Sequence, residues 1–388
     1  MSQHQRNFGL DVIRTVAIVL VLIAHSMYVL YPYMSGFAEI MFNFGTWMTG
    51  AYGVELFFVL SGFLIGGIFI RDEIYRRDKA DAERKSDLRS VSGFYLRRLI
   101  RTIPNYILYF FIFLTADRYF QKGNFLHSFP WKNFFLVQNF YHNDGRGFMG
   151  IAWSLSVEEF FYLFLPLLYI LFRLLKRTRM NAFLYTACIL WLVPNLLKLH
   201  YLFFLAPHTG FINIHLLHTT LFRLDSIAYG IFLAVIYQCD FAKSMQRWVQ
   251  ERRIHLLLAG ILLTVAGLAY NFLFVIKPVQ QANMIYWSYP LRSIGLVLLF
   301  PFFIGWNKAR AGLMTKAISY TALFSYSIYL SHVIVIESFE ELKVMRHWNI
   351  APVLQMLIVW VLTFLISAGT YYGLEKPVLK LRDKLIIK

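Results

Sequence analysis

The chain has 388 residues, of which 58% are hydrophobic and only 15% charged, and its formal net charge is +17. A soluble domain is about half apolar and about a quarter charged, so this composition excludes an ordinary soluble globular protein. The two cysteines, Cys188 and Cys239, form no metal-binding or redox pattern.

Apolar stretches of about 20 residues recur along the chain, each long enough to cross the hydrocarbon core of a bilayer as a helix. We therefore predict an all-α, polytopic integral membrane protein that forms a single domain over residues 1–388. Its one sizeable polar insert is a cytoplasmic loop at about 71–101, rich in charges of both signs. The ten predicted spans lie near residues 10–31, 47–70, 102–119, 150–172, 182–205, 217–237, 254–276, 289–306, 318–338 and 352–374.

The basic residues are distributed unevenly between the two sides of these spans. With the N-terminus in the cytoplasm, 27 of the 38 Lys and Arg lie on cytoplasmic segments and 7 on outer loops. This asymmetry follows the positive-inside rule and predicts that both the N- and the C-terminus are cytoplasmic. The high net charge therefore reflects topology and contact with anionic lipids, and it does not indicate nucleic-acid binding.

An arginine and a histidine lie inside the first predicted span. Arg14 and His25 are eleven residues apart, which is three helical turns plus about 20°, so their side chains share one helix face. Along the axis they are roughly 16 Å apart. A polar group in hydrocarbon is expensive unless it is paired or faces a wet cavity, so both are candidates for function. The alternatives are that Arg14 snorkels to the headgroups and that His25 makes an interhelical hydrogen bond.

Five predicted helices carry ionisable side chains at a similar depth, about 9–12 Å from their outer ends. Isolated charges at this depth are costly, so we expect these side chains to converge around one polar cavity. The neighbours Glu158 and Glu159 point about 100° apart, so we expect only one of them, with Glu158 favoured, to face the cavity. The residues at this depth are His25, Glu55, Glu158, Glu159, Arg223, Asp225 and His332.

Three arginines gather where the polar loop reaches the membrane surface. Arg98 and Arg101 are i, i+3 neighbours and share a face if this stretch is helical, and Arg97 precedes them. Guanidinium groups suit phosphate oxygens better than any other side chain. A phosphorylated donor can bind there and at Arg14 while its reactive end reaches His25, whose neutral imidazole is a natural general base. The alternative is simple positive-inside charge.

Other polar residues have structural explanations. Ser61 precedes Gly62 and can serve close helix approach, and His332 can serve packing or hydrogen bonding. His215 and His218 form an HxxH spacing near His208, but no carboxylate or cysteine completes a site, so we expect no metal.

Several stretches occur in an order that is typical of one family. They are Arg14 and His25 in a span beginning GLDVIR, GVELFFVLSGFLI (53–65), YLRRLIRTIPNY (95–106), WSLSVEEFFYLFLP (153–166), YSIYLSHVIV (326–335) and YYGLEKP (371–377). Together they resemble the acyltransferase-3 family of membrane O-acyltransferases, and the resemblance covers nearly the whole chain. The residues before the fourth-span motif, Ile151 and Ala152, depart from the polar residue common there, so substrate contacts can differ.

The resemblance implies transfer of an acyl group, often acetyl, from cytoplasmic acyl-CoA to a hydroxyl of a sugar, glycan or glycolipid acceptor such as a surface polysaccharide. It implies a multi-pass protein of the inner (cytoplasmic) membrane that works without a metal. Some relatives carry a C-terminal SGNH-type domain; we expect none here, which leaves open a separate extracytoplasmic acyl-handling partner. The implied catalytic residues are His25, Glu158, Glu159, Glu55 and Ser61; Arg14, Arg97, Arg98 and Arg101 would hold the donor; Arg223, Asp225, His332, Trp153 and Tyr329 are substrate or structural candidates.

Two other functions fit some of the same residues. A transporter or flippase, proton-coupled through Glu55, Glu158 and His332, also suits ionisable residues near the midplane, although we find no repeat between the two halves. A non-catalytic subunit of a glycan-export assembly is the third possibility. Within the acyltransferase hypothesis, an acyl-enzyme relay is an alternative to direct transfer.

Overall fold

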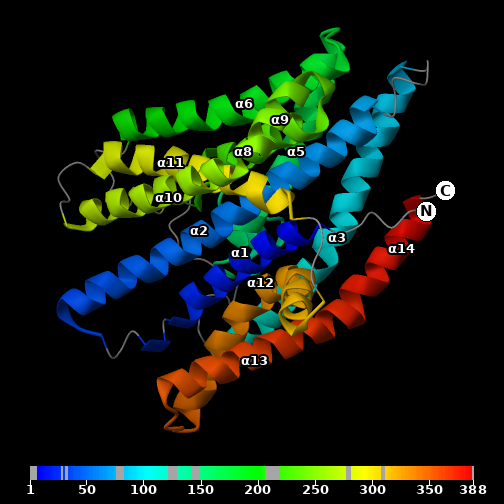
Figure 1. Cartoon of the computed structure of the whole chain (residues 1–388). Coiled ribbons are helices and arrows are strands. Elements are labelled where there is room, and N and C mark those ends of the chain that lie inside the picture. Colours follow the sequence, from blue (N-terminus) through cyan, green and yellow to red (C-terminus); the bar gives the residue numbers. More distant parts are fainter. Residues whose placement is uncertain are drawn as a thin grey trace.

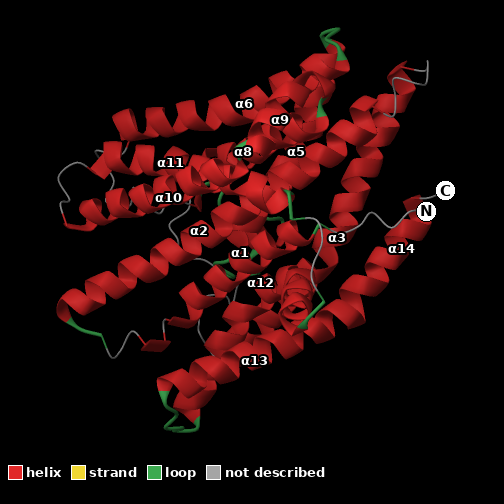
Figure 2. Ribbon diagram, in the orientation of Figure 1, coloured by secondary structure: helices red, strands yellow, loops and turns green. Residues whose placement is uncertain are grey.

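The computed structural model describes residues 7–27, 29–30, 34–75, 83–120, 129–140, 148–205, 218–276, 281–306 and 311–386. Within these ranges every regular element is a helix, and ten helices are long and apolar enough to cross a membrane. Figures 1 and 2 show them as one bundle of long, roughly aligned helices. The prediction of an all-α polytopic membrane protein with about ten spanning helices is confirmed.

The helices follow one another in the order that the predicted spans require. They are α1 (Phe8–Ser26), α2 (Gly36–Phe69), η2 (Ile70–Tyr75), α3 (Glu83–Tyr119), α4 (Trp131–Phe134), α5 (Ala152–Leu174), α6 (Arg179–His200), η3 (Tyr201–Leu205), α8 (Thr220–Gln238), η5 (Asp240–Ala242), α9 (Lys243–Glu251), α10 (Arg253–Ile276), α11 (Gln281–Ile304), α12 (Leu313–Met345), α13 (Pro352–Thr370), η7 (Tyr371–Glu375) and α14 (Lys376–Ile386).

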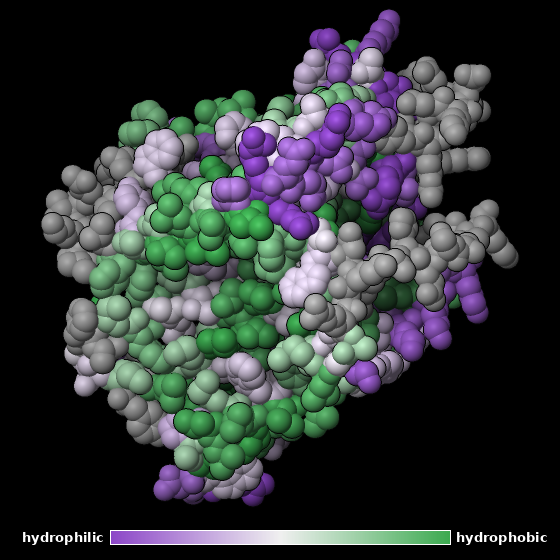
Figure 3. Space-filling view, viewed as in Figure 1, coloured by the Kyte–Doolittle hydropathy of each residue, from purple (hydrophilic) through white to green (hydrophobic). Residues whose placement is uncertain are grey.

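The helix α1 begins and α14 ends on the same side of the bundle, which we call the terminal side (Figure 1). Because successive long helices run up and down, α2 and α5 end on this side, while α3 and α12 begin there. In the face shown in Figure 3, hydrophilic residues gather mainly on the terminal side, and hydrophobic residues cover the flank of the bundle. Such a flank is suited to contact with lipid.

The helix α2 lies in the centre of the bundle, where it packs against α1 on one side and α8 on the other. Glycines make the second contact close. A Cβ atom on Gly62 would lie 2.0 Å from the carbonyl oxygen of Ile227, and one on Gly230 would lie 2.0 Å from that of Val59. Glycine is therefore required at both positions for the two backbones to come this near.

The helix α3 differs from the prediction at its start. The sequence placed a loop up to residue 101 and the next span from 102, whereas α3 is continuous from Glu83 and its apolar, membrane-length part begins at Val91. Pro104 lies inside this helix and does not begin it. The three arginines therefore lie on a helix, where their spacing fixes which of them share a face.

Candidate active site

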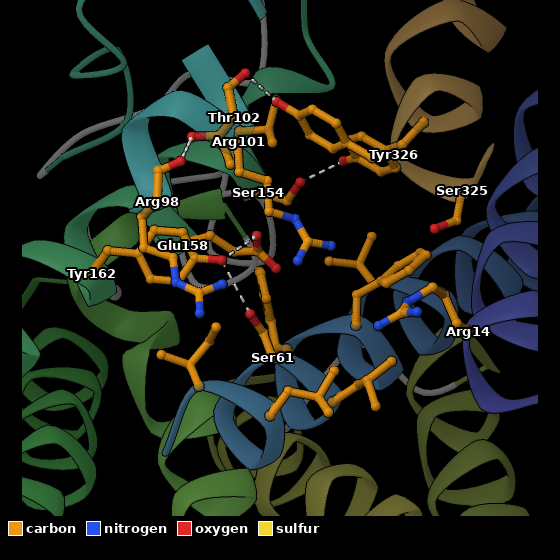
Figure 4. Close-up of a pocket in the computed structure, with 18 of the residues that line it drawn as sticks. Arg14, Ser61, Arg98, Arg101, Thr102, Ser154, Glu158, Tyr162, Ser325 and Tyr326 are labelled. Carbon is orange, nitrogen blue, oxygen red and sulfur yellow. Dashed lines mark hydrogen bonds between the residues drawn. The ribbon is translucent and has the colours of Figure 1, made fainter. Parts of the chain in front are cut away.

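The five helices α1, α2, α3, α5 and α12 enclose a cavity of about 300 Å³ (Figure 4). One wall consists of α2 side chains from Val54 to Ile68, and fourteen residues of helix correspond to about 21 Å. This wall is largely apolar, and the polar groups of the cavity come from the other four helices and from Ser61. The cavity is thus long and narrow, with one apolar side.

Three arginines line the part of the cavity nearer the terminal side. Arg14 comes from α1, and Arg98 and Arg101 come from one face of α3 (Figure 4). Arg98 is only 7% exposed, lies over the rings of Phe94 and Tyr162, and has no hydrogen-bond partner for its Nε. Arg14 lies 3.7 Å from Asp11, one helical turn away. Arg97, in contrast, does not line the cavity.

A series of hydroxyls and a carboxylate lies halfway along the cavity. The Tyr162 hydroxyl donates to Glu158 Oε2 at 3.2 Å, and the Ser61 hydroxyl lies 3.4 Å from the Tyr162 oxygen. Glu158 lines the cavity and Glu159 does not, which agrees with the expected 100° between them. Our prediction did not include Tyr162, although its place one turn after Glu158 on α5 was a usable signal.

Two aromatic rings close the end of the cavity away from the terminal side. Phe57 and Tyr329 both line it, with ring centroids 6.4 Å apart. The Tyr329 hydroxyl donates to the carbonyl oxygen of Ile151 at 3.0 Å and lies 2.5 Å from the Ser154 hydroxyl. These bonds fix the Tyr329 ring in place.

His25 is not a lining residue, but a series of ring contacts joins it to the cavity. The Tyr329 ring lies 5.7 Å from the His332 ring, which in turn lies 4.8 Å from the His25 ring. His25 Nδ1 bonds to the Val21 carbonyl oxygen at 2.9 Å, so Nδ1 carries the proton and Nε2 is left as the basic atom. His25 is therefore a candidate base just beyond the closed end of the cavity.

A second polar cluster lies apart from this cavity, at the meeting of α2, α6, α8 and α11. Glu55 pairs with Arg223, lies 3.6 Å from Arg292, and accepts a hydrogen bond from Ser293. Lys198 pairs with Asp225 at 2.5 Å. The five charged side chains are at most 3% exposed. None of them lines the cavity, so the expected convergence of ionisable groups on one site is replaced by two separate groups.

Trp153 and His218 lie near the same end of the bundle as the histidine pair. Their rings are 4.6 Å apart, and Trp153 also contacts Phe58. Burial lowers the pKa of His218 to about 4, so this ring is neutral at physiological pH and packs as an aromatic group. His208 and His215 lie outside the described residues. No group of three possible metal ligands occurs among the residues that the structure describes.

Comparisons with known proteins agree on one family. The sequence model of the acyltransferase-3 family, described as "Acyltransferase domain", matches residues 7–372. O-acetyltransferase OatA of Staphylococcus aureus (strain NCTC 8325 / PS 47) is 25% identical over 355 residues, which cover 86% of this chain and 53% of that protein. The putative O-acetyltransferase SACOL0978 of Staphylococcus aureus (strain COL) is 25% identical over 203 residues, 49% of this chain and 31% of that protein. The chain thus spans about half or less of the length of these curated relatives. No solved structure matches it.

Proposed function

This chain belongs to the acyltransferase-3 family, and on that basis we propose that it is a membrane O-acyltransferase that moves an acetyl group from acetyl-CoA to a hydroxyl of a sugar or glycan-like acceptor. The observation that carries the proposal is the cavity itself, which runs from three arginines to the Tyr329–His332–His25 series. The names of the O-acetyltransferase relatives support the acetyl group and the ester product.

The arginines are the proposed site for the phosphates of CoA. Guanidinium groups match phosphate oxygens in charge and geometry, and three from two helices converge at one end of the cavity. The apolar wall of α2 then accommodates the pantetheine arm, whose amides can hydrogen-bond to Ser61, Tyr162 and Glu158 halfway along. CoA is made and used in the cytoplasm, so this arrangement has the terminal side in the cytoplasm, as the distribution of Lys and Arg also indicates.

His25 is the proposed general base. Its Nε2 accepts the proton of the acceptor hydroxyl while the hydroxyl oxygen attacks the thioester carbonyl carbon. The carbon–sulfur bond then breaks, and the CoA thiolate takes the proton from His25. A neutral imidazole suits this exchange because its pKa lies near physiological pH in the unperturbed side chain. In this mechanism the acyl group passes directly to the acceptor.

The second cluster has a different proposed role. Glu55, Arg223 and Asp225 bond to one another's neighbours and not to the cavity, so we assign them to holding α2 against α8. Arg97 and Glu159 lie next to lining residues without lining the cavity themselves, and we assign them no direct contact with the donor.

The test uses donor binding, which needs no knowledge of the acceptor. The thermal stability of the purified protein in detergent is measured against acetyl-CoA and CoA, because a ligand that binds only the folded state stabilises it by mass action. We expect saturable stabilisation, lost in Arg98→Ala/Arg101→Ala and kept in Arg97→Ala, a matched control on the same helix. If neither compound at millimolar concentration has an effect, the donor site is wrong and the transporter or flippase alternative gains support.

A further inference from the structure

The closed end of the cavity has a defined shape. Phe57 on α2 and Tyr329 on α12 meet edge to face with their ring centroids 6.4 Å apart. Tyr329 is only 7% exposed, and its hydroxyl is held by the Ile151 carbonyl and by Ser154 on α5. Two aromatic side chains from opposite walls, one of them hydrogen-bonded to a third helix, form a rigid barrier.

The position of this barrier decides what can lie against it. Phe57, Ser61, Leu64 and Ile68 follow one another at helical spacing along one face of α2, with Ile68 nearest the terminal side and Phe57 farthest from it. A CoA held by the arginines directs its pantetheine arm along this face toward Phe57. The thioester must end near His25 to react, and the only aromatic groups between are Tyr329 and His332 among the described lining and ring contacts.

We propose that Phe57 and Tyr329 together form an acyl stop, which limits the donor to acetyl-CoA by leaving no room beyond the second carbon of the acyl group. This inference rests on the proposed function and adds the residues that set chain length. A longer chain would have to displace well-packed aromatic rings, and overpacking of a rigid wall weakens binding. A shortened Phe57 would instead leave an apolar space, in which each added methylene improves affinity about fourfold.

The experiment measures the concentrations of acetyl-, propionyl-, butyryl- and hexanoyl-CoA that give half-maximal thermal stabilisation. In the unaltered protein we expect acetyl-CoA to bind most tightly and butyryl-CoA at least tenfold more weakly. In Phe57→Ala we expect the order to reverse, with butyryl-CoA about tenfold tighter than acetyl-CoA. Leu64→Ala is the matched control: it shortens a lining residue two turns nearer the arginines, so it should weaken all four donors alike and keep their order.

The outcomes separate the inference from the proposed function. If acetyl-CoA stabilises the protein but Phe57→Ala keeps the chain-length order of the unaltered protein, the acyl stop is wrong while the donor site stands. If no acyl-CoA stabilises the unaltered protein, the proposed function fails and the inference fails with it. Should Phe57→Ala not fold, Phe57→Val removes part of the ring and must still shift the preference toward propionyl-CoA.

Discussion

The imidazole rings of His25 and His332 lie edge to face, with centroids 4.8 Å apart and planes at 73°. Each ring bonds through Nδ1 to the carbonyl one turn earlier in its own helix, that of Val21 for His25 and that of Ile328 for His332. The proton of each neutral ring is thereby placed on Nδ1, and both Nε2 atoms are acceptors. His332 Nε2 is buried and has no hydrogen-bond partner. Two basic nitrogens thus lie together beside the end of the cavity.

Replacement of His25 by Ala should abolish acyl transfer and leave donor binding unchanged. General-base catalysis contributes about 10²–10⁴-fold to a rate, so the remaining transfer should fall below 1% or so. Transfer can be measured as base-labile acetate on the surface material of cells that express the protein, and donor binding as thermal stabilisation by acetyl-CoA. The control is His218→Gln, which alters a histidine that packs against Trp153. Near-normal transfer by His25→Ala would show that another group is the base.

Replacement of His332 separates a hydrogen-bonding role from packing. Gln can place an acceptor oxygen near the position of Nε2, whereas Leu fills the space without one. We expect His332→Leu to lower kcat at least tenfold at unchanged KM for acetyl-CoA, and His332→Gln to recover most of the loss, because an acceptor near His25 stabilises it while it carries the extra proton. Equal losses in both variants would mean that His332 matters only for packing.

The sequence is sufficient to predict the number of helices and the arginine group, and the reason is periodicity. Arg98 and Arg101 share a face at any helix orientation, so their joint presence in the cavity follows from spacing alone. Depth along the membrane normal, in contrast, is only one coordinate. Glu55 and Ser61 are six residues apart on α2, which is about 240° around the axis, so they face different neighbours. Glu55 therefore meets Arg223 on α8, while Ser61 lines the cavity.

The sequence could not specify which buried charges pair, because pairing depends on how each helix is rotated in the bundle. Arg292 and Lys198 were recognisable only as charges at the edges of spans, yet the structure places both in the second cluster. Tyr289 gave no signal at all, although its ring lies 4.6 Å from Arg223 and 4.8 Å from Arg292. Such cation–π contacts are worth about 2 kcal/mol or more each when they are desolvated.

Removal of the Glu55 carboxylate should destabilise the fold strongly. Glu55→Ala leaves Arg223 and Arg292 buried without their shared counter-charge, and breaking a buried pair costs about 3–5 kcal/mol. The surface pair Asp240–Lys243, whose side chains are 71% and 66% exposed, provides the control, because Asp240→Ala should cost less than about 1 kcal/mol. The free energy of unfolding in detergent measures both. Equal, small losses would mean that Glu55 is not the structural centre of the cluster.

The close contact between α2 and α8 predicts a strong effect of a single methyl group. In Gly62→Ala the new Cβ would lie 2.0 Å from the Ile227 carbonyl oxygen, so the helices must move apart and the free energy of unfolding should fall by several kcal/mol. Gly369→Ala is the matched control on α13, where no atom lies within 4 Å of the added Cβ. There the better helix propensity of Ala should stabilise by up to about 1 kcal/mol. Because Ser61 adjoins Gly62, Gly62→Ala should also weaken acetyl-CoA binding, and unaltered stability and binding in this variant would contradict the observed packing.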